Sequence, residues 1–136
     1  MNIANFILDN FAEERLPIIN GIVDDRNVFT TVTLGIQTEV WTLQALPPVP
    51  FEKANTKAFL NDMSYITVLN TLHHDGCTFY CGEGSWGGDG FVLATKSNTF
   101  HWLFFHQYAN PIETLSLKNN TLSCTNNLEV KFGIPI

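Results

Sequence analysis

The chain has 136 residues, 45% of them hydrophobic and 12% aromatic, which is enough for one packed domain over residues 1–136 and excludes a disordered chain. Acidic residues number 13 and basic residues 7, so the net charge is −6, and Lys and Arg form no cluster anywhere. Such a chain cannot neutralise a row of phosphates, and we therefore expect no nucleic-acid binding.

The first fifty residues predict a helix followed by three strands. Apolar residues at helical spacing predict a short amphipathic helix over residues 3–14, and Pro17 ends it. Two β-rich runs, residues 18–23 and 28–34, flank a short polar turn and predict a hairpin. Residues 36–45 alternate between two faces, which predicts a third strand, and three prolines then break the chain.

Residues 52–74 carry two conflicting patterns. Apolar residues recur at intervals of three and four from Phe59 to Leu72, which favours a helix, whereas residues 64–72 are rich in β-branched and aromatic types, which favours a strand. We predict a helical segment, because the helical period persists and ends at Asp75-Gly76, a suitable helix stop. A break at Asn61-Asp62 would divide it into two helices, with Asp62 capping the second.

The last sixty residues predict an antiparallel meander. Apolar runs alternate with turns rich in Gly, Asn and Ser. The predicted strands are residues 77–81, 91–95, 100–106, 113–117, 121–124 and 128–132. The fold class that follows is α+β, with an N-terminal helix and one inserted helical segment packed on a largely antiparallel, meander-rich sheet.

Cysteine and histidine are the residues that could carry metal or nucleophilic chemistry. Cys77 and Cys81 would lie about 13 Å apart on one strand, too far for a single metal, and we predict neither metal nor cofactor. A thiol nucleophile with a histidine base is conceivable, but His101 and His106 would point to opposite faces of their strand. We predict no catalytic residues and no enzyme activity.

The location of the protein is predicted from what the N-terminal region lacks. Asp9 interrupts the first apolar run too early for a signal peptide, and no apolar stretch reaches the ~18 residues of a membrane span. We therefore expect a cytoplasmic protein that does not bind membranes, with reduced thiols.

The loop over residues 82–90 is the most distinctive stretch of the chain. Its glycine spacing resembles a phosphate cradle, but it opens a strand instead of a helix and carries Glu83 and Asp89 in place of a lysine. Two interpretations remain: a flexible connection with Trp86 tucked into the core, or an acidic recognition loop with Trp86 as an aromatic anchor. Together with Asp24 and Asp25 in the predicted hairpin turn, these residues form the candidate partner-binding set.

The run Gly84-Ser85-Trp86-Gly87-Gly88-Asp89-Gly90-Phe91-Val92, followed by Trp102-Leu103-Phe104-Phe105 and Ala109-Asn110-Pro111, resembles a family of small bacterial proteins. Immunity proteins of polymorphic-toxin and contact-dependent growth-inhibition systems show a comparable cadence over two consecutive strands. The resemblance covers residues 84–111. It implies an acidic, cytosolic protein that binds a cognate toxin domain, often a basic nuclease, and blocks it by direct contact.

Two other classes of function remain open. A curved sheet against helices could enclose an aromatic-lined pocket, as in a small ligand-binding domain or enzyme. The predicted edge strand 128–132 could pair with a copy of itself in a homodimer, although Lys131 opposes this.

Overall fold

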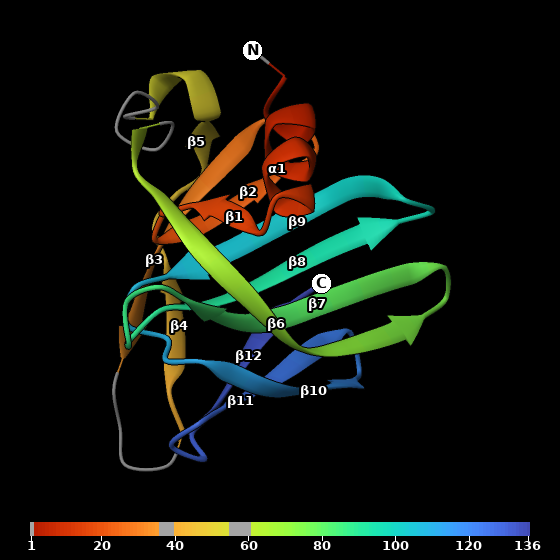
Figure 1. Ribbon diagram of the computed structural model, residues 1–136. Coiled ribbons are helices and arrows are strands. Elements are labelled where there is room, and N and C mark those ends of the chain that lie inside the picture. Colours follow the sequence, from red (N-terminus) through yellow and green to blue (C-terminus); the bar gives the residue numbers. More distant parts are fainter. Residues whose placement is uncertain (1, 36–39, 55–60) are drawn as a thin grey trace.

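The structure of the protein is a computed structural model that describes residues 2–35, 40–54 and 61–136 (Figure 1). The large sheet contains β1 (Arg15–Pro17), β2 (Gly21–Asp24), β3 (Val28–Gly35), β4 (Thr42–Ala45), β5 (Val49–Pro50), β6 (Met63–His74), β7 (Cys77–Gly84), β8 (Gly90–Lys96) and β9 (Thr99–His106). The small sheet contains β10 (Ile112–Lys118), β11 (Thr121–Asn126) and β12 (Lys131–Pro135). Helix α1 (Ile3–Ala12) precedes the strands, and a short 3-10 turn, η1 (Phe51–Lys53), follows β5. The described chain is therefore mostly antiparallel sheet with an N-terminal helix.

The strand order of the large sheet brings the N-terminal hairpin to the far side of β9. The order is β1-β6-β7-β8-β9-β2-β3-β4, with β5 beside β3. Strands β6 to β9 follow one another both along the chain and across the sheet, joined by short turns. Helix α1 lies against one face of this sheet and the small sheet lies against the other, as Figure 1 shows.

Helix α1 forms where the spacing of apolar residues predicts it. The side chain of Asn2 caps its first turn, because Oδ1 accepts hydrogen bonds from the N–H groups of Ala4 (3.0 Å) and Asn5 (3.4 Å). Ile3 and Ile7 are buried against the large sheet. The helix ends at Ala12, two residues before the predicted end.

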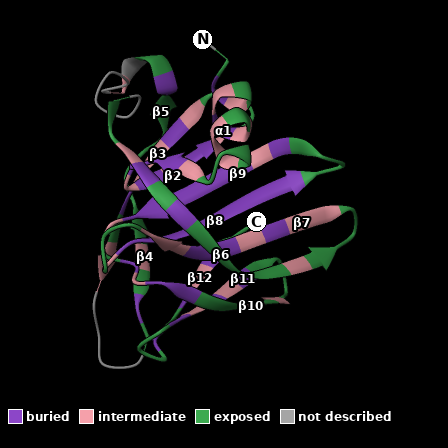
Figure 2. Ribbon diagram, in the orientation of Figure 1, coloured by how far each residue is buried: buried purple, intermediate pink, exposed green. Residues whose placement is uncertain are grey.

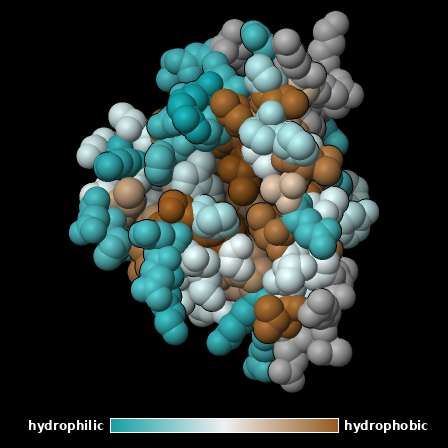
Figure 3. Space-filling model, turned by 180° about the vertical axis from the view of Figure 1, so that it is seen from behind, coloured by the Kyte–Doolittle hydropathy of each residue, from teal (hydrophilic) through white to brown (hydrophobic). Residues whose placement is uncertain are grey.

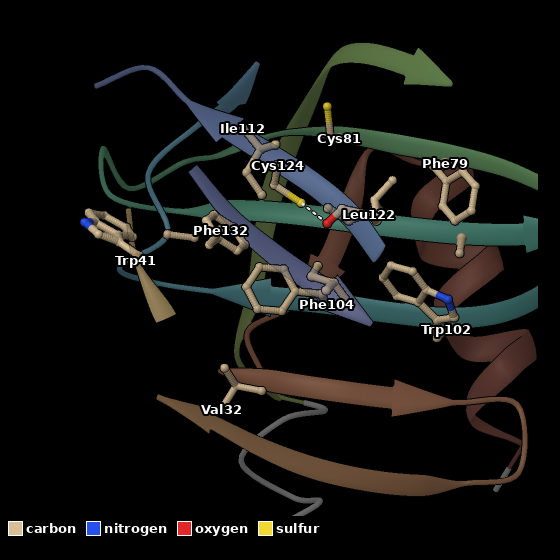
Figure 4. Packing of buried hydrophobic residues seen from close by; sticks show 14 of the residues in the cluster. Val32, Trp41, Phe79, Cys81, Trp102, Phe104, Ile112, Leu122, Cys124 and Phe132 are labelled. Carbon is tan, nitrogen blue, oxygen red and sulfur yellow. Dashed lines mark hydrogen bonds between the residues drawn. The ribbon is translucent and has the colours of Figure 1, made fainter. Parts of the chain in front are cut away.

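Strands β8 and β9 form the centre of the core because both of their faces are covered. In β9, Leu103 and Phe105 point toward α1, whereas Trp102 and Phe104 point toward the small sheet. Figure 4 shows the packing between the large and the small sheet, where residues of β9 meet Leu122, Cys124 and Phe132. Burying a side chain of this size stabilises the fold by about 1.5–3 kcal/mol. Strands β8 and β9 thus fix the position of the loop before β8 and of the segment after β9.

Most of the predicted strands are confirmed, with shifted ends. The predicted hairpin is β2 and β3, the predicted strand in 36–45 is present as β4, and residues 36–39 lie outside the described residues. The strands predicted at 77–81, 91–95, 100–106, 113–117 and 121–124 are β7 to β11. The predicted strand 128–132 begins only at Lys131, and its edge there is occupied, because the N–H of Trp41 donates to the carbonyl of Lys131 (2.8 Å).

The helix predicted over 52–74 is wrong for residues 63–74, which form β6, while residues 55–60 lie outside the described residues. Strand β6 pairs with β7 from Ile66 to His74, and a register shift lies between Val68 and Asn70. Because of this shift, Ile66 packs on the α1 side of the sheet and Leu72 on the small-sheet side. An irregular strand buried on alternate faces therefore produced the apolar spacing of a helix.

Candidate functional site

The loop between β7 and β8 is held by a buried carboxylate. Asp89 is only 1% exposed, and its Oδ2 accepts hydrogen bonds from the Ser64 hydroxyl (3.3 Å) and the Trp86 N–H (3.3 Å). The N–H of Asp89 in turn donates to the carbonyl of Trp86 (2.9 Å), which closes a tight turn. Burial raises the pKa of Asp89, and these hydrogen bonds oppose the rise. Asp89 thus shapes the loop and does not present its carboxylate to solvent.

A pair of serines joins this loop to β6. The hydroxyls of Ser64 and Ser85 lie 3.1 Å apart, and the Ser85 N–H donates to the Ser64 oxygen (2.9 Å). The Ser85 oxygen also accepts a hydrogen bond from the N–H of Tyr65 (3.0 Å). The start of β6 and the loop are therefore fixed to one another at the residue before Trp86.

On its other side, the loop lies against the segment that follows β9. The N–H of Asn110 donates to the carbonyl of Gly88 (2.8 Å). A Cβ at Gly88 would lie 2.7 Å from the carbonyl oxygen of Gln107, so the two backbones approach more closely than any other residue type would allow. The segment over 107–110 carries Tyr108 and is held against the loop at Gly88 by these contacts.

Three large aromatic side chains project from these three joined segments. Tyr65 is 69% exposed, Trp86 67% and Tyr108 67%, and we refer to them as the aromatic surface. Exposed aromatics on a backbone fixed by hydrogen bonds are typical of protein-binding hot spots, because little conformational entropy is lost on binding. Only Trp86 was predicted from the sequence. Tyr65 lay in the segment predicted to be helical, and nothing local marked Tyr108.

The five residues predicted to bind a partner fall in two separate places. Asp24 is opposite Trp102 in the pairing of β2 with β9, whereas Gly90, which ends the loop, is opposite His106. These positions are four residues, or about 13 Å, apart along β9. Glu83 is half-buried near the end of β7, beside the aromatic surface. The acidic turn and the aromatic surface are therefore distinct.

Asp24 and Asp25 differ in what their carboxylates do. Asp24 Oδ1 accepts hydrogen bonds from the N–H groups of Arg26 (2.9 Å) and Val28 (3.0 Å), and its other oxygen pairs with the Arg26 guanidinium (3.2 Å). This side chain forms the turn that the sequence predicted. Asp25 is exposed, and its carboxylate lies 3.5 Å from Nδ1 of His101.

A hollow with an apolar floor lies beside this acidic turn. Its volume is about 360 Å³, and Ile22, Trp102 and Ile134 line it together with Asp25 and His101. The C-terminus lies behind the large sheet in Figure 1, and Figure 3, drawn from that side, shows apolar atoms gathered in a hollow in the middle of this face.

The side chains of Cys81, Cys124 and His106 are buried in the core. Burial raises the pKa of Cys81 to about 12 and that of Cys124 higher still, so neither thiol ionises readily. Nε2 of His106 lies 3.0 Å from the Val32 carbonyl and Nδ1 lies 3.1 Å from the Tyr108 N–H, so backbone groups use both ring nitrogens. Across 2–35, 40–54 and 61–136, His, Cys, Asp and Glu form no group of three that could hold a metal ion.

The chain was compared with known proteins on three levels. No family model, curated protein or solved structure matches it. Within the part of the chain that the structure describes, no helix has the length and apolar character needed to cross a membrane.

Proposed function

We propose that the chain is a non-catalytic binding protein that neutralises a cognate toxin, a basic protein, by direct contact centred on the aromatic surface. The observation that supports this proposal is the exposure of Tyr65, Trp86 and Tyr108 on segments that hydrogen bonds join to the loop over residues 85–89. A contact of this kind needs no reacting group. It needs apolar side chains held ready for a complementary pocket.

The charge of the chain supports a basic partner. A net charge of −6 attracts a positively charged protein and speeds its association, more so at low ionic strength. The identification of that partner as a toxin rests on the resemblance of residues 84–111 to immunity proteins. A cytoplasmic location follows from the same proposal, since such a toxin acts inside the cell.

The first experiment is a comparison of three tagged proteins used as bait in extracts of the source cell. They are the wild type, Trp86→Ala and a control, His74→Ala, which changes an exposed side chain at the opposite end of the β6–β7 pair. Removing an anchor of this kind costs about 2 kcal/mol or more, roughly a thirtyfold loss of affinity. We expect one stoichiometric basic protein with the wild type and the control, and its loss with Trp86→Ala.

The second experiment tests what binding achieves. The captured protein is expressed in a cell with either the wild type or Trp86→Ala, and growth is measured. We expect growth arrest by the partner alone, rescue by the wild type and a weaker rescue by the variant. A captured protein that leaves growth unaffected, or full rescue by Trp86→Ala at equal protein level, would remove the basis of the proposal.

One observation favours a second candidate function, the binding of a small ligand. The hollow of about 360 Å³ beside Trp102 has an apolar floor and a polar rim formed by Asp25 and His101. A thermal-shift screen with small molecules discriminates between the two. Stabilisation that saturates with one compound, and that Ile136→Trp abolishes by filling the hollow from its exposed side, would favour ligand binding.

A further inference from the structure

Strand β6 is paired along only part of one of its edges. It spans Met63–His74, and β7 pairs with it from Ile66 to the end. On the other edge, β1 pairs only with residues 63–65, and the N–H of Ile66 donates to the carbonyl of Glu14 (2.8 Å). Among the described strands, none pairs with residues 67–74 on that edge, although β10 lies against the later part of β6, where Nδ2 of Asn70 donates to the carbonyl of Glu113 (3.1 Å). The open stretch is therefore residues 67–69. Figure 1 shows β6 crossing the front of the molecule, and Figure 2 shows exposed residues along much of its length.

The backbone at Val68 is directed toward this open edge. Successive N–H groups of a strand point to opposite sides, so groups two residues apart point the same way. Since the N–H of Ile66 points toward Glu14, the N–H of Val68 points out from the same edge. Val68 lies before the register shift, so this alternation still holds there.

At Glu14 the backbone departs from the direction of β1, and a hollow lies beside this point. Glu14 has φ 60°, in the left-handed region, and the backbone there turns away from the strand direction toward α1. Past this turn, Phe11, Glu14, Ile66, Thr67 and Val68 line a hollow of about 330 Å³. The hollow lies beside residues 66–68 of β6, which β1 would face if it began before Arg15. The edge and the hollow together have the form of a strand-acceptor site.

The usual protections of an edge strand are mostly absent from β6. Its twelve residues include no Lys, Arg, Asp, Glu or Pro, the residues that keep open edges from pairing with other chains. Two protections remain, the register shift between Val68 and Asn70 and the contact of Asn70 with β10, and both follow Val68. In a chain with a net charge of −6, a strand without charged residues whose edge is open after Ile66 is a surface suited to pairing.

We propose that β6 accepts an extended segment of the protein partner as an additional strand, in line with β1 and paired with β6 at Val68. One apolar side chain of that segment fills the hollow beside Phe11, and a Lys or Arg lies near Glu14. This rests on the proposed function, because it assigns a segment of the same basic partner to the strand next to Tyr65. The occupant is a partner and not a second copy, because two chains of charge −6 repel one another.

The test uses a synthetic peptide of alternating lysine and valine as the probe, so it does not depend on the identity of the partner. Amide hydrogen exchange of the isotope-labelled full chain is followed by NMR. At a peptide concentration ten times its dissociation constant, exchange at the Val68 N–H should slow by about tenfold. A peptide with the same sequence but N-methylated on alternate amides should give no protection, because it lacks the ladder hydrogen bonds.

Two variants of the chain and one control complete the test. Val68→Lys places a charge against the basic peptide, and Val68→Pro removes the outward N–H while leaving the β7 ladder intact. Both should weaken peptide binding tenfold or more. For Val68→Lys this is measured by protection of the N–H at position 68, and for Val68→Pro, which has no N–H there, by the peptide concentration needed to shift the amide signals of neighbouring residues. Leu46→Lys adds the same charge at an exposed aliphatic position at the other end of the large sheet, next to β4, and should bind like the wild type. Thermal unfolding checks that each variant is folded.

Three results would overturn the inference. These are no protection of Val68 at any peptide concentration, protection that rises with protein concentration without peptide, and equal loss in Leu46→Lys and Val68→Lys. The second would identify a second copy as the occupant. Trp86→Ala should bind the peptide normally. Failure of the bait experiment with intact protection at Val68 would therefore reject the proposed function alone, and the reverse would reject the strand addition alone.

Discussion

Replacing Asp89 tests whether a buried carboxylate holds the aromatic surface in place. In Asp89→Ala, the Trp86 N–H loses its acceptor and the Ser64 hydroxyl loses one of its partners. Hydrogen bonds to a charged group contribute about 1.5–3 kcal/mol each, and this gain is offset by the cost of burying the charge. We expect the free energy of unfolding to fall by about 2 kcal/mol. For a chain of this length that is roughly 6–10 °C in melting temperature.

The matched variant Asp89→Asn separates the acceptor from the charge. Its amide oxygen can still accept from Trp86 and Ser64, so we expect most of the stability to return. Because the folded-state pKa of Asp89 is raised, the folded chain holds this proton more tightly than the unfolded chain does. Wild-type stability should therefore decline as the pH rises from the unfolded pKa through the folded one. Asp89→Asn should not show that decline.

The assay is urea unfolding at several pH values, with amide exchange in residues 85–88 as a local measurement. Asp89→Ala should speed that exchange, whereas Asp89→Asn should leave it close to wild type. Equal stability of wild type and Asp89→Ala, or equal damage in both variants, would refute the reasoning that the acceptor at position 89 holds the loop.

The remaining predictions concern the core, the thiols and the buried imidazole. Phe104→Ala should cost about 3–5 kcal/mol in urea unfolding, whereas Tyr108→Ala should change stability by no more than about 0.5 kcal/mol. In the native protein, a thiol reagent at mildly alkaline pH should label Cys77, which is half-buried, and spare Cys81, whose pKa is about 12; rapid labelling of Cys81 would contradict its burial. Burial lowers the pKa of His106, so the unfolded chain binds this proton more readily and stability should fall as the pH drops through about 6.5. His106→Gln should remove that part of the acid sensitivity in the same unfolding assay.

The central strands were predictable because both of their faces are buried. Such strands appear in sequence as continuous apolar runs, here Phe91 to Ala94 and Trp102 to Phe105, bounded by turn residues. Turn chemistry then fixed the hairpins: Ser97 and Asn98, between β8 and β9, both adopt positive φ. Local sequence was sufficient wherever the pattern and the turn agreed.

Strand β6 was mispredicted because its burial changes face along its length. Ile66 and Leu72 pack on opposite sides of the sheet, a consequence of the register shift between Val68 and Asn70. A pattern that changes face within twelve residues has no clean period of two. The composition of β-branched residues carried the correct signal, and the helical spacing outweighed it. Contact with β7, which sequence alone does not reveal, decides between the two.

Of the three aromatic residues of the candidate site, Trp86 could be predicted from the sequence, whereas Tyr65 and Tyr108 could not. The glycine-rich loop identified Trp86, but its neighbours Tyr65 and Tyr108 come from segments about twenty residues away on either side. The attachment of these two segments to the loop depends on the pairing of β6 with β7 and on the close approach of Gly88 to Gln107. Such contacts are set by tertiary register, so no local pattern predicts them.

The loop matches neither of the two interpretations that the sequence left open, because it is fixed by hydrogen bonds and Trp86 does not lie in the core. Its pattern of burial supports the proposed binding role. Trp86 is exposed, as a recognition loop requires, while Asp89 is buried, as a structural role requires. A fold selected for stability alone would bury the large apolar indole and expose the carboxylate, because each arrangement lowers the free energy. This chain does the opposite at two positions three residues apart. Departures of this kind from the stable pattern are expected at binding sites, where an exposed side chain must be kept ready for a partner.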